Sequence, residues 1–320
     1  MESEDKKKLF AFKPVFFLSS VSLLILAIIF TFYFQTFTQN EQMDHKGFAN
    51  QANSTALADP PSGNEEIVLF VGLGKEDDDH VTPQTISLAN YSHKEEKLRH
   101  ALLLEDSYVS IPGGPDHKLK LAYSYGGIEL LIETIEDHFG VNITYYALFP
   151  PKGVADLIDF LVPQGFNTKE MESRLTSNIS LLDDPLPYLD VGQDLPDTLD
   201  GSQTVMLLHT LNGKENSYSR NKIREEIERT LFQETLSLPN KEEISTLVNL
   251  LRNRSETNMS TSSMFSWVNN LVHTPYTELE TDVFPLENTY QYETYSHAGD
   301  VITWDQTTNE RAIEDFFKEN

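Results

Sequence analysis

The sequence contains no cysteine, so no disulfide stabilises it, and its 320 residues must depend on an apolar core. Basic residues are also scarce. There are 24 Lys and Arg against 50 Asp and Glu, which gives a formal net charge of −26. Such a chain lacks the basic surface that proteins use to contact nucleic acid phosphates. We therefore exclude nucleic acid as a partner and expect cations or a cationic partner at the surface.

Several catalytic and nucleotide-binding motifs are missing too. The sequence has no GxxxxGK[ST], HExxH or GxSxG motif, and its nine His residues are scattered without ligand spacing. A GLG at 72–74 follows an apolar run, but Asp77 stands where a dinucleotide fingerprint needs its third glycine. The acidic EDDDH at 76–80 is either a hard-cation site or a solvated loop.

One apolar stretch is long enough to cross a membrane. Residues 15–34 read VFFLSSVSLLILAIIFTFYF and carry no charge. As a helix they span about 30 Å, the thickness of a bilayer core. The run exceeds the apolar part of a secretory signal and continues into TFTQNEQ without a cleavage site. We predict an uncleaved transmembrane signal anchor here; a buried soluble helix is the alternative.

The flanking charges predict the orientation of this anchor. Residues 1–14 contain four lysines, whereas Glu41 and Asp44 are the first charged residues after the span. Because positively charged flanks remain inside, residues 1–14 should be a cytoplasmic tail and the body extracellular. Residues 35–64 are polar and aperiodic and end in ADPPSGN, which is typical of a linker. The expected location is the cell membrane, with a single pass.

Strand and helix patterns alternate along the body. The predicted strands are 65–71, 84–90 and 143–149, with one or two more within 98–111. Helical spacing of apolar residues occurs at 128–139, 154–161 and 222–236. This alternation predicts an α/β sheet covered on both faces. The body is expected at 65–236, with 237–320 as a mostly helical C-terminal extension of it.

Other stretches are less regular. We interpret AYSYGG (122–127) as a strand ending in a tight double-glycine turn, and we expect Gly140 to end the helix that follows. The pattern does not decide between helix and strand for TVMLLHTL (204–211). Residues 241–272 indicate two helical pieces, and ERAIEDFFKE closes the chain as a helix.

A series of motifs follows a fixed order along the chain: DSYVSIPG, HKLKLAYSYGG, an amphipathic helix, DGSQTVMLL and a basic helix, all after a single N-terminal span. In this order, over residues 65–236, the chain resembles the LytR-CpsA-Psr family. It implies a three-layer α/β/α sandwich with a mixed central sheet. It also implies a bacterial cell-envelope phosphotransferase that attaches lipid-linked anionic polymers to peptidoglycan. Such a protein binds polyprenyl pyrophosphate with Mg²⁺ and arginines.

Several charged positions of the family are replaced here. The family's Ser-Ile-Pro-Arg-Asp-Thr appears as residues 102–107, with Glu105 in place of the arginine and Asp106 kept. Gln84 stands where the family has an acid, and His209 and Leu211 stand where it has Arg-x-Arg. The acid of Gly-x-Asp-x-Arg is also missing from GLGKE at 72–76.

The resemblance identifies candidate site residues in this chain, with fewer charged residues than the family has. The candidate catalytic residues are Asp106, Lys118 and Arg224, with Asp106 also the candidate Mg²⁺ ligand. The candidate pyrophosphate-binding residues are Lys75, Lys120 and Arg220. Each charge-assisted donor at such a site is worth about 2.7–4 kcal/mol. A glutamate in place of an arginine therefore predicts weakened catalysis, because it sets like charge against the phosphate.

Simpler roles exist for three of these residues. Lys118 could be a solvated lysine at a strand end. Asp106 could cap a turn at 107–111, and Arg224 could pair with Glu228 one helical turn further on.

Three functions therefore remain open. The first is a membrane-anchored envelope protein with degenerate catalytic residues, which binds or regulates a lipid-linked glycan or another envelope protein. The second is an active, divergent Mg²⁺-dependent phosphotransferase. The third is a structural or adhesive surface domain, in which C-terminal aromatic residues stack on glycan or simply form a core. These aromatic residues are Tyr290, Tyr292, Tyr295 and Trp304.

Overall fold

The computed structural model describes residues 66–77, 80–92, 94–171, 173, 196–210, 217–273 and 278–318. The predicted tail, anchor and linker at 1–64 lie outside these residues. Among the described helices, none is both long and apolar enough to cross a membrane.

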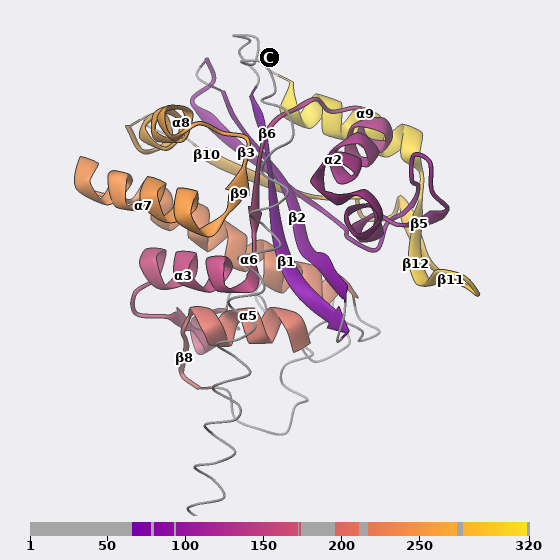
Figure 1. The fold of residues 1–320 in the computed structure, drawn as a ribbon, viewed down its shortest axis with the longest axis horizontal. Coiled ribbons are helices and arrows are strands. Elements are labelled where there is room, and N and C mark those ends of the chain that lie inside the picture. The colour runs from indigo at the N-terminus through magenta and orange to yellow at the C-terminus, as the bar shows by residue number, and fades with distance from the viewer. Residues whose placement is uncertain are drawn as a thin grey trace, which may run out of the picture. The chain divides into compact units, whose positions relative to one another are not determined.

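A six-stranded mixed sheet lies at the centre of these residues (Figure 1), in the order β10-β3-β2-β1-β6-β9. The strands are β1 (Ile67–Asp77), β2 (His80–Ser92), β3 (Lys97–Leu103), β6 (Ile143–Phe149), β9 (Glu256–Thr257) and β10 (Glu278–Phe284). β1 is antiparallel to β2 and parallel to β6, while β3 is antiparallel to β2 and parallel to β10. The strands predicted at 65–71, 84–90 and 143–149 are confirmed.

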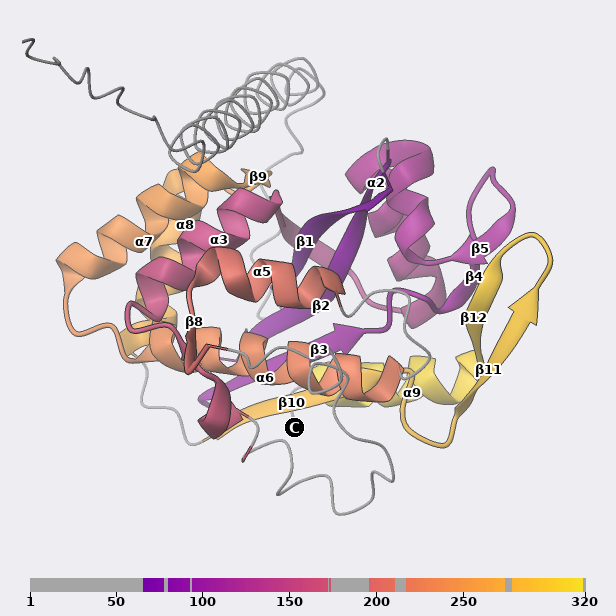
Figure 2. The same ribbon diagram turned by 90° about the horizontal axis from the view of Figure 1, so that it is seen from below.

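Helices cover both faces of the sheet, as Figure 2 shows. One face carries α3 (Pro151–Leu161), α5 (Gly201–Thr210), α6 (Ser217–Leu236), α7 (Lys241–Arg254) and α8 (Thr261–His273). The other carries α2 (Lys120–Phe139) and α9 (Gln306–Phe317). The predicted three-layer α/β/α architecture is therefore confirmed, and the undecided stretch at 204–211 is helical through residue 210.

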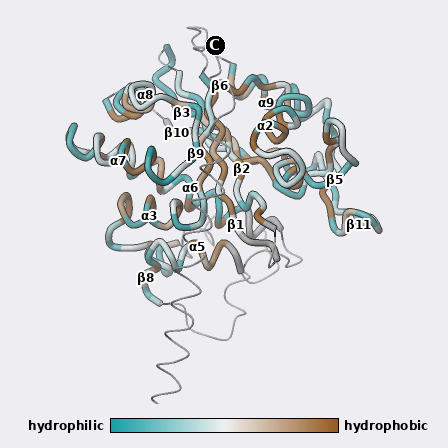
Figure 3. The backbone as a smooth tube through the Cα atoms, in the orientation of Figure 1, coloured by the Kyte–Doolittle hydropathy of each residue, from teal (hydrophilic) through white to brown (hydrophobic). Residues whose placement is uncertain are grey.

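The central strand β1 shows why the sheet is a core element. Val68, Leu69 and Val71 are almost fully buried, although they point to alternating faces. A strand covered on both faces has no polar side, so its sequence is a continuous apolar run. Figure 3 shows the same concentration of hydrophobic residues along the sheet between the two helical layers.

The double glycine lies inside a helix, so the strand predicted before it is wrong. Residues 120–125 are helical, and α2 runs from Lys120 to Phe139 with a kink at Gly126 and Gly127. Gly127 has φ of 72°, which L-residues with a side chain rarely adopt. The helix ends at Gly140 as predicted, with φ of 66°. The alternation in LAYSY was therefore a short amphipathic turn whose buried side includes Ala122.

The C-terminal part is less helical than the sequence indicates. The predicted pair α7 and α8 is present, and α9 closes the described residues. Between them, β10 forms one edge of the central sheet, and β11 (Tyr290–Tyr295) and β12 (Gly299–Trp304) form a hairpin. β9 and β10 flank α8 in the sequence and form the two opposite edges of the sheet. Residues after 236 therefore complete the sheet.

Two further short strand pairs belong to the described part of the fold. β4 (Tyr108–Ser110) pairs with β5 (Asp116–Lys118), directly after β3. β7 (Phe166–Asn167) pairs with β8 (Thr198–Leu199), beside α3 and α5. The β4–β5 hairpin brings residues of the family-like motif beside the end of β3.

Candidate functional site

A tight turn at the end of β3 holds two of the residues that the sequence singled out. The N–H of Ser107 donates to the carbonyl of Leu104 at 3.0 Å. The N–H of Lys120 then donates to the carbonyl of Glu105, also at 3.0 Å. This second bond ties the start of α2 to the turn, so Glu105 and Asp106 have fixed backbone positions.

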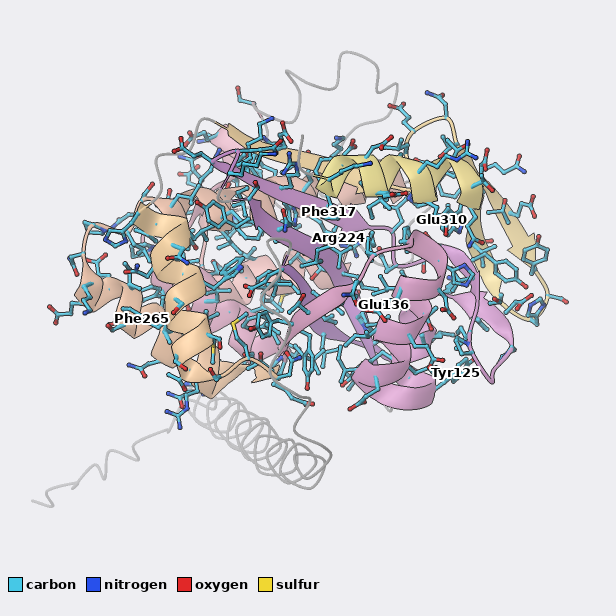
Figure 4. The ribbon with its side chains drawn as sticks, turned by 90° about the horizontal axis from the view of Figure 1, so that it is seen from above. Tyr125, Glu136, Arg224, Phe265, Glu310 and Phe317 are labelled. Atoms are coloured by element: carbon cyan, nitrogen blue, oxygen red, sulfur yellow. The ribbon has the colours of Figure 1, made fainter. Side chains whose placement is uncertain are left out.

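Glu105 and Arg224 form a buried ion pair. Arg224 Nη1 donates to Glu105 Oε1 at 2.6 Å, and the two side chains are only 1% and 7% exposed. Figure 4 shows Arg224 in the interior, between the sheet and the helices. A charge-assisted bond of this length is strong, and its carboxylate lies where the resemblance places an arginine. The arginine of α6 therefore meets an anion supplied by the protein itself.

Asp106 meets two ammonium groups. Its Oδ1 lies 3.4 Å from Lys118 Nζ and 3.3 Å from Lys120 Nζ. Lys120 is the more buried of the two lysines. The structure therefore brings together three of the predicted site residues, on β5, α2 and the turn after β3. Lys118 is not an isolated solvated lysine, and Asp106 does more than cap a turn.

The remaining predicted site residues are placed less fully. Lys75 lies in β1 and Arg220 in α6, but neither side chain is among those described.

Among the described residues, no group of three or more His, Asp and Glu has a geometry that would hold a metal ion. Asp106 as a magnesium ligand stays a prediction. Its present partners are cations, so the donor set on its own does not fit Mg²⁺.

A large apolar cavity lies between the sheet and the five helices of one face. Its empty space measures about 880 Å³ when the open mouth is included. Apolar lining side chains come from β1, α3, α6, α7 and α8, and include Phe70, Leu157, Leu231, Leu247 and Trp267. A second hollow of about 690 Å³ shares Gly72, Thr85, Val154 and Leu208 with it. The two hollows therefore adjoin.

The cavity begins one helical turn beyond the buried ion pair. Ile227, three residues after Arg224 on α6, lines the cavity. Glu228 is the one charged side chain among the described lining residues, and its Oε2 lies 2.6 Å from Nε2 of His100. His100 is fully buried on β3. Arg224 and Glu228 thus pair with Glu105 and His100, respectively, and tie α6 to the sheet.

A second group of titratable residues lies on the opposite face of the sheet. Burial first, and then the charges of Glu256 and Glu129, together raise the pKa of both Tyr123 and Tyr146 to about 12. Burial, then the charge of Glu129, raises the pKa of the Glu256 carboxyl. Tyr123, Tyr146 and Glu256 are half-buried and Glu129 is exposed, and the two tyrosine hydroxyls stay protonated near neutral pH.

Comparison with known proteins defines the class to which this chain belongs. Residues 30–313 match the LytR_cpsA_psr family. The match covers most of the chain, so the chain is a member of that family, as its motifs indicated.

Curated relatives agree with this assignment. The regulatory protein MsrR of Staphylococcus aureus (strain COL) is 24% identical over 253 residues, which cover 79% of this chain and 74% of MsrR. A polyisoprenyl-teichoic acid–peptidoglycan teichoic acid transferase, TagU of Bacillus cereus (strain AH820), is 24% identical over 117 residues. That match covers 36% of this chain and 39% of TagU.

A solved structure has the same fold. YwtF (TagT) of Bacillus subtilis, with bound octaprenyl pyrophosphate lipid, superposes with a TM-score of 0.54 at 16% identity. The superposition covers 82% of this chain and 95% of the other. At this identity the likeness shows the fold alone.

Sequence reasoning missed the cavity and the His100–Glu228 pair. The lining residues are ordinary Leu, Val and Phe, which in a sequence are indistinguishable from core residues. The sequence does set Arg224 and Glu228 at i and i+4 beside the apolar Ile227 and Leu231. That spacing predicts a pair within the helix, so it gave no signal for partners on another element.

Proposed function

We propose that this protein is a membrane-anchored, extracytoplasmic family member that holds the prenyl tail of a lipid-linked glycan without transferring the glycan itself. It would act as a binding or regulatory partner in cell-wall polymer attachment. The observation that carries this proposal is the buried pair between Arg224 and Glu105 beside an apolar cavity. The ion pair opposes phosphoryl transfer, and the apolar cavity favours lipid binding.

The cavity supports the tail-binding half of the proposal. Apart from Glu228, its described lining is made of aliphatic, aromatic and small hydroxyl side chains. Apolar surface removed from water contributes about 25 cal/mol per Å². A prenyl chain presents only such surface, so its burial here needs no polar partner. The octaprenyl pyrophosphate in the YwtF (TagT) structure shows that this fold accommodates a ligand of that class.

The ion pair supports the loss of transfer. A pyrophosphate needs bidentate arginine donors that neutralise the charge developing in the transition state. A phosphate that approached the Arg224 guanidinium would also approach the buried Glu105 carboxylate, which already lies 2.6 Å from Nη1. An uncompensated buried charge is strongly unfavourable. The protein therefore favours its own carboxylate over a ligand phosphate.

The predicted anchor completes the proposal. A chain anchored by 15–34 would keep its cavity near the bilayer, the source of any prenyl lipid. We assign the body to the cell envelope on this basis.

The test uses the full-length protein in detergent micelles. The chain has two tryptophans, and one of them, Trp267, lines the cavity. Octaprenol and octaprenyl pyrophosphate should both change its fluorescence, with dissociation constants that agree within about threefold, or less than about 0.7 kcal/mol. Similar affinities are expected because the head group finds Arg224 already paired. The variant Trp267→Phe should lose the signal and identify its source.

Two variants test the location. Leu231→Phe narrows the cavity and should weaken octaprenol binding, whereas Met206→Phe, on the exposed side of α5, should not. Transfer of a lipid-linked polymer to peptidoglycan by the purified protein alone would overturn the proposal. So would an absence of octaprenol binding.

One observation favours the active transferase as a second candidate. Lys118 and Lys120 converge on Asp106, so a phosphate that displaced this carboxylate would meet two ammonium groups. In that case Lys118→Ala should abolish transfer, while Lys152→Ala, which removes an exposed lysine of α3, should leave it unchanged. Transfer that survives Lys118→Ala would rule this candidate out.

A further inference from the structure

The strand β10 lies at one edge of the central sheet, beyond β3, as Figure 2 shows. All seven of its residues pair with β3 on the inner side. Within the part of the chain that the structure describes, no strand pairs with its outer side. Residues 279–283 are half-buried, whereas six of the seven residues of β3 are buried. β10 is therefore a long and accessible edge, the kind of surface to which a further strand can add.

Hydrogen bonds around β10 show which of its backbone groups face outward. The carbonyl of Phe284 accepts from the N–H of Leu104, which follows β3, so the backbone of Phe284 faces inward. Backbone groups of successive strand residues point to opposite sides. The outward-facing residues are therefore Leu279, Thr281 and Val283. The N–H of Val283 donates to Oδ1 of Asp282, a side chain, at 2.8 Å. An added strand would displace only this side chain from that N–H.

The two faces of β10 carry different side chains. On the face towards α6 and α8, Arg229 donates to Oγ1 of Thr281, and Leu279 packs against a buried apolar cluster. On the opposite face, Glu280 Oε2 lies 3.3 Å from Nε of Arg99 on β3. Apolar or neutral residues thus alternate with acidic ones along the strand. A strand added at this edge would continue both faces.

A polar hollow adjoins the outer edge near the end of β10. Its empty space measures about 520 Å³ when the open mouth is included. The charged side chains among its described lining residues are Lys222, Glu225, Asp282 and Glu287, so carboxylates outnumber the single ammonium group. Burial is the main cause that raises the pKa of the Asp282 carboxyl, and the charge of Glu225 adds to the rise. A cation placed beside Asp282 would offset both effects.

We propose that the outer edge of β10 binds an extended segment of a partner protein in which apolar and basic residues alternate. The backbone of that segment adds a strand to the sheet. Its apolar side chains continue the face of Leu279 and Val283, and its basic side chains lie near Asp282 and the polar hollow. A second copy of this chain fits less well, because it would set β10 carboxylates against a surface whose whole chain carries −26.

This surface is separate from the apolar cavity. No residue of β10 is among the described residues that line the cavity. The inference therefore goes beyond the proposed function and does not depend on tail binding.

The experiment measures binding of the peptide acetyl-Lys-Val-Lys-Val-Lys-Val-Lys-amide to the full-length protein in detergent, by isothermal titration calorimetry. Two further peptides are compared with it. In one, Glu replaces every Lys; in the other, the order is Lys-Lys-Val-Val-Val-Lys-Lys, which keeps the charge but not the alternation. Both should bind at least tenfold more weakly than the first peptide.

Two pairs of variants test the location. Thr281→Pro removes an outward N–H but no bond to β3, a position at which an edge strand tolerates proline. It should weaken binding at least tenfold, whereas Thr281→Val, which keeps the N–H, should stay within about threefold. Asp282→Asn should weaken binding several-fold. Its matched control is Asp300→Asn, which removes an exposed carboxylate of β12.

Three results would overturn the proposal. The first is no binding of the alternating peptide tighter than about 1 mM, and the second is equal binding of the peptide without alternation. The third is dimerisation of the protein alone in sedimentation, abolished by Thr281→Pro, because the edge would then bind a second copy. Thermal unfolding confirms that each variant is folded, and the peptide comparison and Asp282→Asn decide the question even where Thr281→Pro unfolds.

Discussion

Arg224 of α6 and Glu105 of the turn after β3 form an ion pair, with 2.6 Å between Nη1 and Oε1. The two residues are 119 positions apart in the sequence. The pair lies at the junction of the apolar cavity and the turn that carries Asp106. A buried ion pair has two consequences for this protein. It fixes α6 against the sheet, and it occupies the arginine that a phosphate would need.

Removing one partner of this pair should destabilise the fold severely. Arg224→Met leaves the Glu105 carboxylate buried without its cation, and we expect a loss of about 3–5 kcal/mol in the free energy of unfolding. Urea denaturation measures this loss. The double variant Glu105→Leu/Arg224→Met should recover most of it, because no charge then remains buried.

The control is Arg254→Met, which breaks an ion pair of similar length with Asp156 at the surface. The Arg254 side chain is 40% exposed, so this change should cost no more than about 1 kcal/mol. Equal losses for Arg224→Met and Arg254→Met would contradict the interpretation.

Asp106→Asn should strengthen the binding of inorganic pyrophosphate. The aspartate holds Lys118 and Lys120 within 3.4 Å, and its neutralisation leaves both ammonium groups to an added anion. We expect calorimetry at low salt to give a dissociation constant several-fold lower than that of the unaltered protein. This gain in affinity should diminish as the ionic strength rises. If Asp106 instead holds magnesium for the anion, the same change will weaken binding in the presence of Mg²⁺.

Gly201→Ala should loosen the packing of α5 on α3. A Cβ at this position would lie 2.1 Å from the carbonyl oxygen of Ala155, which is backbone and cannot move aside alone. We expect a loss of about 1–3 kcal/mol in unfolding free energy. Gly114→Ala is the matched control, because its Cβ would make only ordinary contacts with Ile111. An unchanged midpoint of unfolding for Gly201→Ala would contradict this prediction, because it would mean that α5 and α3 move apart with little loss of unfolding free energy.

Glu256→Gln should stabilise the protein near neutral pH. Burial, and secondly Glu129, raises the pKa of the Glu256 carboxyl above 4.5 in the folded chain. Its ionisation therefore costs stability at pH values above the folded-state pKa, and this cost fades as the pH falls through that pKa towards 4.5.

The measurement is the thermal midpoint of both proteins as a function of pH. The advantage of Glu256→Gln should be largest near neutral pH and should close towards pH 4.5. Glu314→Gln, at an exposed position of α9, should show no such trend. A difference that grows on acidification would mean that the Glu256 carboxylate is favourably paired.

Much of the fold could be predicted because its signals are local. β1 and β6 are apolar runs of strand length, and α2 ends at a glycine in the left-handed conformation. The region before Gly126 was predicted wrongly because a short amphipathic turn and a short alternating strand share one pattern. β10 escaped prediction because its sequence ELETDVF is polar, and only its position beside β3 makes it a strand.

The pairing of the candidate site residues was not predictable from the sequence. The resemblance to the family grouped Asp106, Lys118 and Arg224 as candidate site residues and set Glu105 at an arginine position; their shared role stays a prediction. Which acid meets which base depends on distances between elements, and no spacing along the chain contains these. Arg224 has a helical neighbour at i+4 in Glu228, yet the structure pairs Arg224 with Glu105 and Glu228 with His100.

The sequence by itself determined the acidic balance, the absence of disulfides, the apolar segment at 15–34 and the family motifs, since each is a property of composition or local order. Tertiary structure alone decided three things. It formed the apolar cavity from core-like residues, neutralised Arg224 with Glu105, and stacked Trp304 on Phe139 while it left Tyr292 exposed. The physical reason is that burial and charge pairing depend on which surfaces the packed elements bring together.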